Sequence, residues 1–352
     1  MKIAIVGGGV MGCATALALA KRGAEVVVLE RAVPGAEASS AAAGILGAQI
    51  EMHEKGTMLE TFVRARREYA AWASELRESS GIDIGYRVSG ALHTAQTDAE
   101  TEEIAHAVSW QRAAGLPAEL LDARAAREVE PELAKEITAA AYYPEESQVD
   151  PPALLRALVV AAARARVTMK SGATVERVIV ESDRCVGVRV DALHGGDLRA
   201  DAVVLAAGSW SSLVPGVPHD MPRVSPARGQ IVLLDERPPR LRAIVVGGAT
   251  YAVPRGDGRV LCGSTLEFVG FRREVTAGGV HAILSGALRT VPSLAEAAMT
   301  ATWSNFRPHT EGEERLVGKS KLPGLFLATG HFRNGILLAK VTADAVADAV
   351  LG

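Results

Sequence analysis

The sequence predicts a two-domain α/β (α+β) protein, in which a doubly wound nucleotide-binding domain is joined to a second, mainly antiparallel β-sheet domain. The first thirty residues have the order strand, glycine turn, helix, strand and acid, which is typical of a βαβ unit. Residues 225–271 instead alternate apolar and polar side chains between proline and glycine turns, as antiparallel strands do. The chain of 352 residues is also longer than a single hydrophobic core usually supports.

The βαβ unit carries a spacing that favours dinucleotide binding. Gly7, Gly9 and Gly12 form a G-x-G-x-x-G pattern between a strand at 3–6 and a helix at 10–22. The first glycine allows the tight turn, the second lets backbone amides approach a pyrophosphate, and the third lets the helix pack on the strand. The helix N-terminus attracts the diphosphate. A second strand, 25–29, ends on Glu30, a carboxylate suited to accept hydrogen bonds from a ribose hydroxyl.

Composition and charge exclude other classes of function. The net charge is −3, so nothing in the electrostatics favours nucleic acid or an anionic membrane as a partner. Cys13, Cys185 and Cys262 are scattered, which predicts neither a disulfide framework nor a metal site and fits a reducing cytoplasm. Residues 3–20 resemble a signal peptide or a membrane span, but the glycine run in their middle favours the nucleotide-binding turn. We therefore expect a soluble cytoplasmic protein.

The first half of the chain continues with a small-residue stretch at 34–47, which suits either close approach to a ligand or a flexible loop. An amphipathic helix follows at 57–79, and Gly81 ends it. Its apolar face is expected to lie in the core: Leu59, Phe62, Tyr69, Trp72 and Leu76. Three further kinds of element are predicted up to residue 148: short strands at 82–94, helices at 98–114 and 122–129, and an extended segment at 140–148.

The second half begins with Asp150 as the N-cap and Pro151 as the first residue of a helix that extends to about residue 165. Strands at 174–180, 185–190 and 202–207 follow, and the last ends on small residues around Gly208 that would admit a ligand closely. The remaining predicted elements are the antiparallel sheet of 225–271, a helix at 277–289, a polar loop at 309–315 that follows residues 303–308, a strand at 324–328, and a turn at 329–338 before a terminal helix.

This order of elements predicts a discontinuous domain arrangement. Residues 1–80, 145–222 and 300–352 are expected to form the nucleotide-binding domain. Residues 81–144 and 223–299 are expected to form the second, substrate-binding domain.

Two observations favour FAD over a nicotinamide cofactor. The chain has one G-x-G-x-x-G pattern and lacks the second copy that a two-nucleotide reductase would need. Its last thirty residues place a glycine-bounded turn before a helix, and the long FAD molecule needs a second contact far along the chain. There the helix dipole would stabilise negative charge on the flavin. We expect a Rossmann-type domain that binds FAD non-covalently.

Five stretches point to a family, namely IVGGG at 5–9, SAAAGILGA at 40–48, YAVPR at 251–255, FRP at 306–308 and GHFRNGILLA at 330–339. With these stretches in this order, the chain resembles the D-amino-acid oxidase family of flavoenzymes, and within it the glycine oxidases of thiamine biosynthesis. The first stretch is generic, whereas the second and the last are specific.

The resemblance implies which residues hold FAD. Val10, Met11, Glu30 and Arg31 would bind the adenosine diphosphate half. Val175 would touch the middle of the cofactor. Two segments would line the remainder, Ser39, Ser40, Gly44, Ile45 and Leu46 on one side and His331, Phe332, Arg333, Asn334, Gly335, Ile336 and Leu337 at the pyrimidine edge.

The resemblance also implies the substrate-binding residues. Arg307 would bind the carboxylate of an amino acid, Tyr251 would assist with its hydroxyl, and the backbone carbonyl of Arg333 would contact the amine. Arginine suits the first role because its planar fork matches a carboxylate with two parallel hydrogen bonds. From the residue type alone, a structural salt bridge at Arg307 is equally plausible. Leu266 falls where pocket-lining residues are expected. Arg64, Arg66 and Arg67 suit the polar face of a helix, and Arg272 with Arg273 suits a solvated corner.

The implied reaction is hydride transfer from the substrate Cα to flavin N5, followed by hydrolysis of the imine to an α-keto acid and ammonia. Oxygen then regenerates the flavin and yields hydrogen peroxide. The expected substrates are glycine, sarcosine or small D-amino acids, and the imine of glycine would supply the thiamine thiazole. An alternative is a dehydrogenase of the same fold that passes electrons to a carrier. An NAD-dependent enzyme or a nucleotide-binding module without turnover is disfavoured by the late turn and by Arg307.

Two residues depart from the family pattern. Lys340 stands where relatives usually have proline, and Arg272 stands where an acid is common. No histidine is expected to act as acid or base. The resemblance further implies a homotetramer.

Overall fold

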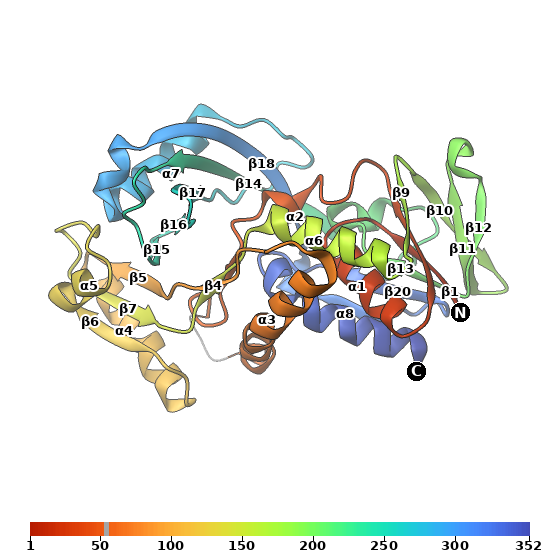
Figure 1. Cartoon of the computed structure of the whole chain (residues 1–352), viewed down its shortest axis with the longest axis horizontal. Helices are drawn as coiled ribbons and strands as arrows, with labels where there is room; N and C mark the ends of the chain where they lie inside the picture. Colours follow the sequence, from red (N-terminus) through yellow and green to blue (C-terminus); the bar gives the residue numbers. More distant parts are fainter. Residues whose placement is uncertain (53–55) are drawn as a thin grey trace.

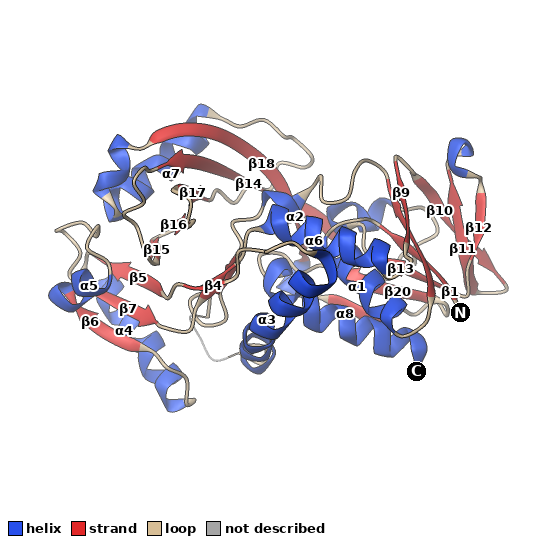
Figure 2. Cartoon of the chain, viewed as in Figure 1, coloured by secondary structure: helices blue, strands red, loops and turns tan. Residues whose placement is uncertain are grey.

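The structure is a computed structural model that describes residues 1–52 and 56–352. Two lobes lie side by side along the long axis, each built around its own large sheet, and both chain termini lie in the same lobe (Figure 1). Helices cover the sheets of both lobes (Figure 2). This confirms the predicted two-domain α/β fold class.

A six-stranded sheet forms the centre of the lobe that holds the termini. Its strand order is β19-β20-β13-β1-β2-β9, and all neighbours are parallel except the edge pair β19–β20. The bounds are Lys2–Val6 for β1, Glu25–Glu30 for β2, Thr168–Ser171 for β9, Ala202–Leu205 for β13, Leu316–Lys319 for β19 and Leu325–Thr329 for β20. Because β1 pairs with β2 on one side and β13 on the other, the strand order reverses at β1, where such sheets bind ligands.

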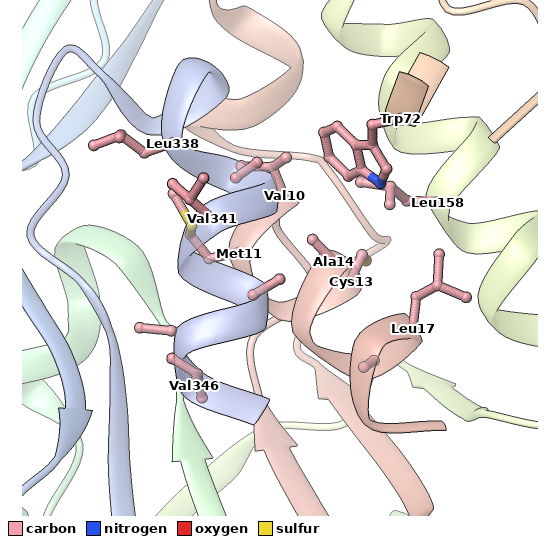
Figure 3. Close-up of a cluster of buried hydrophobic side chains, with 14 of the residues drawn as sticks. Val10, Met11, Cys13, Ala14, Leu17, Trp72, Leu158, Leu338, Val341 and Val346 are labelled. Carbon is pink, nitrogen blue, oxygen red and sulfur yellow. The ribbon is translucent and has the colours of Figure 1, made fainter. Parts of the chain in front are cut away.

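Alternate side chains of β1 face different layers. Ile3 and Ile5 pack among helices, whereas Ala4 and Val6 pack against a small antiparallel sheet on the other face. The helices are α1 (Val10–Lys21), α3 (Leu59–Ser80), α6 (Pro151–Arg164) and α8 (Gly335–Leu351). Met11 and Leu17 of α1, Trp72 of α3, Leu158 of α6 and Val341 of α8 belong to one buried cluster (Figure 3). This packing fixes both the first and the last helix on the same sheet.

An eight-stranded sheet forms the second lobe, in the order β18-β14-β17-β16-β15-β5-β7-β6. Its pairs are antiparallel except β5–β15. The bounds are Ala91–Ala95 for β5, Glu119–Asp122 for β6, Ala139–Tyr143 for β7, Val224–Asp235 for β14, Ile244–Gly247 for β15, Thr250–Pro254 for β16, Arg259–Gly263 for β17 and Ala298–Thr310 for β18. Helices α4 (Asp98–Ala113), α5 (Ala123–Val129) and α7 (Ala277–Thr290) pack on it.

Smaller elements complete the fold. A three-stranded antiparallel sheet contains β10 (Val175–Glu181), β11 (Arg184–Val190) and β12 (Asp197–Arg199). A second one links the lobes through β3 (Ile45–Leu46), β8 (Ser147–Gln148) and β4 (Arg87–Val88). The short helices are α2 (Ala38–Ala41) and the 3-10 turns η1 (Ala192–His194), η2 (Gly208–Leu213), η3 (Pro292–Glu296) and η4 (Glu311–Glu313).

Several local predictions are confirmed. Gly81 ends α3 in the left-handed conformation, and the Asp150 side chain accepts a hydrogen bond from the Ala153 N–H at the start of α6. The expected domain division stays a prediction, and its boundary at residue 300 falls within β18, which belongs to the eight-stranded sheet. In the described residues, no helix is both long and apolar enough to cross a membrane.

Candidate active site

A cavity of about 1440 Å³ lies between the two large sheets. Its walls combine the ends of β1, β2 and β13 with residues of β14, β16 and β18 from the second lobe. The turn before α8 closes another side through His331 and Phe332. The cavity therefore brings together residues from both ends of the chain.

The glycine turn at the end of β1 is packed too tightly for side chains. Gly7 has a φ of +105°, and a Cβ atom there would come closer than 3.0 Å to the Ala206 carbonyl oxygen. A Cβ atom on Gly12 would likewise overlap the Gly7 carbonyl oxygen. Helix α1 begins at Val10 with Gly9 as its N-cap, which provides no side-chain hydrogen bond. The Val10 N–H donates to the Ser39 hydroxyl at 2.9 Å, and the helix start lies at the cavity wall, where its dipole favours an anionic group.

Glu30 lies at the end of β2 and lines the same part of the cavity. Its Oε2 accepts a hydrogen bond from the Gly8 N–H at 2.7 Å, and its Oε1 accepts one from the Ala32 N–H at 2.9 Å. A carboxylate has about four acceptor positions, so two remain for other donors. These bonds hold the carboxylate beside the glycine turn, where a ribose next to a bound pyrophosphate would lie.

Arg31 and Trp210 form the neighbouring wall. The Arg31 guanidinium lies 4.0 Å from the centre of the Trp210 ring and forms a 2.8 Å ion pair with Glu37. Glu37 also pairs with Arg273 of the second lobe at 2.6 Å. Arg272 and Arg273 are both exposed, as expected of a solvated corner, and Arg273 in addition bridges the two lobes.

The turn before α8 forms the far end of the cavity. The Phe332 N–H donates to the Pro308 carbonyl at 3.0 Å, and the Tyr69 hydroxyl donates to the Ile336 carbonyl at 2.6 Å. His331 is buried and its Nε2 lies 2.9 Å from the Thr342 hydroxyl. Burial, with a smaller effect of the Arg315 charge, lowers the pKa of His331 to about 3. His331 is therefore neutral at physiological pH.

Arg307 and Tyr251 face the cavity from the second lobe. Arg307 on β18 donates from Nη2 to the Ser264 hydroxyl at 2.6 Å and from Nη1 to the Thr265 carbonyl at 3.2 Å. Burial lowers the pKa of Arg307, and it raises the pKa of Tyr251, which Arg307 partly opposes. An arginine stays charged even so, and Tyr251 keeps its proton, so the pair presents a cation beside a hydroxyl donor.

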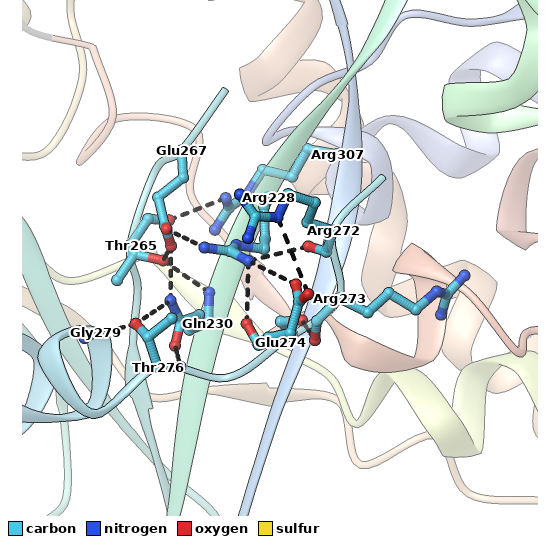
Figure 4. A network of polar contacts seen from close by, with 11 residues as sticks. Arg228, Gln230, Thr265, Glu267, Arg272, Arg273, Glu274, Thr276, Gly279 and Arg307 are labelled. Carbon is cyan, nitrogen blue, oxygen red and sulfur yellow. Dashed lines mark hydrogen bonds and ion pairs between the residues drawn. The ribbon is translucent and has the colours of Figure 1, made fainter. Parts of the chain in front are cut away.

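A network of polar contacts holds Thr265, whose carbonyl accepts a hydrogen bond from Arg307 (Figure 4). Glu267 accepts hydrogen bonds from Arg228, from Gln230 at 2.7 Å and from the Thr265 hydroxyl at 2.6 Å. Burial alone would raise the pKa of Glu267, but these hydrogen bonds outweigh it and lower the pKa to about 2. The ionised carboxylate therefore fixes Thr265, whose carbonyl in turn accepts from Arg307.

The structure places most predicted site residues on this one cavity. The predicted residues that line it are Gly7, Gly9, Val10, Met11, Glu30, Arg31, Ser39, Gly44, Ile45, Val175, Gly208, Tyr251, Leu266, Arg307, His331, Phe332, Arg333, Asn334, Gly335 and Ile336. The proposed role of each remains a prediction.

Four predicted residues do not line the cavity. Gly12 packs α1 against the turn, and Leu46 and Leu337 are buried in the helical core. Ser40 lies beside Gly35 instead. All four are adjacent in the sequence to residues that line the cavity.

Sequence reasoning missed Ser264 and Thr265, and it misplaced Arg66. The two missed residues follow β17 directly, and in the structure Gly263, the residue just before them, pairs with Tyr251. Arg66 was expected on a polar helix face but is only 3% exposed, and it pairs with Glu145 and Glu146. That buried cluster holds the backbone of residues 48–50, next to the cavity. Lys340, which departs from the family pattern, pairs with Asp344 on α8.

The cavity fits FAD on its own geometry. The glycine cradle, the start of α1 and the Glu30 carboxylate suit an adenosine diphosphate, and the start of the 17-residue helix α8 meets the same cavity at Asn334 and Gly335. One long ligand can therefore contact both helix starts.

Comparison with known proteins also points to an FAD-dependent protein, over nearly the whole chain. A family model described as "FAD dependent oxidoreductase" (DAO) matches residues 2–349. The glycine oxidase of Geobacillus kaustophilus is 38% identical over 351 residues, with 99% of this chain and 92% of the relative covered. The bifunctional protein ThiO/ThiG of Nostoc sp. is 37% identical over 354 residues, with 99% of this chain but 52% of the relative covered. The chain thus spans about half the length of that bifunctional relative.

Solved structures agree with this similarity. The crystal structure of glycine oxidase from Geobacillus kaustophilus superimposes with a TM-score of 0.95 at 37% identity and covers 99% of this chain and 94% of its own. The glycine oxidase from Bacillus cereus gives a TM-score of 0.94 at 33% identity, with 100% of this chain and 95% of that chain covered. The similarity therefore extends over both lobes and the cavity between them.

Proposed function

The chain belongs to the DAO family of FAD-dependent oxidoreductases, and from this premise we propose that it oxidises glycine, and also sarcosine or small D-amino acids, with molecular oxygen. FAD is its cofactor, as the family match and the fit of the cavity indicate. For glycine, the overall reaction consumes one O₂ and one water and yields glyoxylate, ammonia and H₂O₂. The similarity to glycine oxidases along the whole chain supports this choice of substrate.

The observation that carries the proposal is the pairing of Arg307 with Tyr251 at one wall of the FAD cavity. A charged guanidinium and a neutral hydroxyl, both half-buried, match the carboxylate of a small amino acid. Each charge-assisted hydrogen bond contributes roughly 1.5–3 kcal/mol net. Leu266 and Arg333 also line this cavity, and in the proposal they limit the size of the substrate and contact its amine.

When bound, FAD supplies the two-electron acceptor, which oxygen restores. The protein residues bind and orient the substrate, so that the reacting carbon is held in one position. Neither His331 nor Tyr251 is suited to remove a proton from the amine, because the histidine is buried with Nε2 bound to Thr342 and the tyrosine has a raised pKa. The proposal assigns neither residue as a base, and the substrate amine arrives deprotonated.

A substrate panel tests the proposal. Purified holoprotein is incubated in air with glycine, sarcosine or D-alanine, and peroxide, ammonia and the keto acid are measured together. Equal amounts of peroxide and glyoxylate from glycine are expected. If glycine reduces the flavin under nitrogen but air then gives no peroxide, the alternative dehydrogenase is correct.

The proposal includes the metabolic role, the location and the oligomeric state of the enzyme. The similarity to ThiO/ThiG proteins supports a role for the imine of glycine in supplying the thiamine thiazole. A cytoplasmic homotetramer is part of the same proposal, and the three cysteines are buried and free, as a reducing compartment allows. Light scattering of the purified protein checks the tetramer, and a mass of one or two chains would exclude it.

A further inference from the structure

A second cavity, of about 590 Å³, lies outside the FAD cavity. Its lining comes from β4, from the segment after α5, from the turn before β15 and from the turn after β16, and within the described residues none of it belongs to the FAD cavity. Four arginines and one carboxylate line it: Arg87, Arg240, Arg242, Arg255 and Glu132. The wall therefore carries an excess of positive charge.

Arg255 is the most buried of these arginines, at 7% exposed. Its guanidinium donates to the Gln148 side chain and to the Ala43 carbonyl, the latter at 2.5 Å, and its Nε has no partner. It makes no ion pair in the described part of the chain. Burial lowers the pKa of Arg255 to about 10. A buried cation is normally paired with an anion, so this charge lacks its usual compensation.

Arg87 also lacks an anionic partner among the described residues. Its Nη2 donates to the Pro254 carbonyl at 2.7 Å, and it forms no ion pair with any described residue. Burial lowers the pKa of Arg87 as well. The two positive charges also repel each other, since Arg87 contributes to the lowered pKa of Arg255.

The other two arginines differ from each other. Arg240 is neutralised, because it pairs with Glu236 at 3.3 Å and lies 3.9 Å from Glu132. Arg242 gives its backbone N–H to the buried Glu130, while its exposed guanidinium makes no hydrogen bond or ion pair with described residues. Asp150 and Asp257, the carboxylates that act on Arg255 from a distance, are both bound to Arg259. Arg87 and Arg255 thus remain without a carboxylate partner, and Arg242 has only the nearby Glu130, which is bound to the backbone N–H groups of Arg242 and Ala243.

We propose that this cavity binds a phosphate group, either free or carried by a small phosphorylated molecule. Arginine forks match the tetrahedral oxygens of phosphate, and arginine is the usual residue for planar, two-bonded recognition of such groups. A volume of about 590 Å³ is within the range of sites for small organic ligands, so a monoester has room.

The site would stabilise the junction between the two lobes. Arg255 of the second lobe holds the carbonyl of Ala43, and Ala43 lines the FAD cavity. A bound phosphate that compensates the charge of this cluster therefore favours the arrangement in which FAD is held. The inference does not depend on which substrate the enzyme oxidises.

The test is thermal release of flavin from the holoprotein, followed by flavin fluorescence in a buffer without phosphate. Inorganic phosphate, or glycerol 3-phosphate against glycerol, replaces sodium chloride at constant ionic strength. The variants are Arg242→Gln, at an exposed position, and Arg87→Gln. Arg223→Gln is the matched control, since Arg223 is exposed and lines neither cavity.

Phosphate is expected to raise the release temperature saturably. Arg242→Gln and Arg87→Gln should each weaken the apparent affinity at least tenfold, while the control keeps it. A tenfold preference for glycerol 3-phosphate identifies a monoester as the ligand, and equal affinity identifies free phosphate. An effect of phosphate no larger than that of chloride, or one that is the same in all variants, would overturn the proposal.

Discussion

The guanidinium of Arg307 lies over the backbone of Gly229, so that a Cβ atom on Gly229 would come closer than 3.0 Å to three guanidinium atoms. Tyr251 has the same relationship to Gly263, its direct partner across β16 and β17. The two proposed substrate-binding side chains are thus accommodated by glycines on the paired strands β14 and β17. This arrangement lets both side chains lie against the sheet instead of crossing the cavity.

Gly229→Ala is expected to displace the Arg307 guanidinium, because a methyl group would occupy its place while the flexible end of the arginine can move. The loss of one charge-assisted contact predicts a KM for glycine that is roughly 10–100-fold higher. FAD affinity should not change. Gly278→Ala is the control, since a Cβ atom there meets nothing within 4 Å. Equal kinetics in the two variants would show that Gly229 does not position Arg307.

Glu267→Gln should loosen the support of Arg307. It leaves the charge of Arg228, which is 6% exposed, without its main partner, and a cost of about 1.5–3 kcal/mol in unfolding free energy follows. The KM for glycine should rise several-fold as Thr265 is released. Glu274→Gln is the matched control, because its carboxylate pairs with the same arginine at 3.6 Å but is 63% exposed. Urea unfolding and steady-state kinetics measure both effects, and a control as damaging as Glu267→Gln would exclude the network.

Glu30→Gln is expected to weaken FAD binding about 10–100-fold, the range for one charge-assisted hydrogen bond. The amide can still accept from the Gly8 or Ala32 N–H, so the turn should keep its shape. Quenching of FAD fluorescence by the apoprotein measures the affinity. Glu25→Gln, an exposed acid at the start of the same strand, should bind FAD normally. An unchanged affinity in Glu30→Gln would remove Glu30 from the cofactor site.

His331 should make the protein sensitive to acid. Its pKa is about 3 in the folded state and 6.5 as the ordinary value, so between these pH values the unfolded chain binds the proton and the folded chain does not. Stability is therefore complete above pH 6.5 and is lost as pH falls toward 3, by about 1.4 kcal/mol per pH unit from this residue.

His331→Gln tests this dependence, because the amide can keep the hydrogen bond to Thr342 but cannot titrate. Urea unfolding between pH 4.5 and 6.5 should show a shallower loss of stability in this variant than in the wild type. His106→Gln, at an exposed position, should retain the wild-type slope. If His331→Gln also retains it, the histidine is not held neutral by burial.

The sequence predicted those parts of the fold in which local pattern and tertiary structure agree. The βαβ unit, the Asp150 cap and the Gly81 stop each depend on a few neighbouring residues, and all three formed as expected. The edge strands β9 and β12 were missed because they are short, and β9 also pairs with β2, which is far away in the sequence. Arg66 was misplaced because its partners Glu145 and Glu146 are far away in the sequence.

The candidate site was predictable in its backbone segments and less so in its supporting residues. The glycine turn and the turn before α8 were found from spacing, and both line the cavity. Ser264, Thr265 and Gly229 were not, because their importance arises only when three strands of the second sheet are aligned beside Arg307. The second cavity could not be predicted for the same reason, because its arginines come from β4, from the turn before β15 and from the turn after β16.

The most direct test of the account is an anaerobic titration of the yellow holoprotein with glycine, with wild type and Arg307→Ala compared side by side. We predict that glycine bleaches the flavin of the wild type, and that Arg307→Ala keeps its flavin but needs at least tenfold more glycine for half-bleaching. Failure of glycine to bleach the wild-type flavin, or the same half-bleaching concentration in both proteins, would contradict the account.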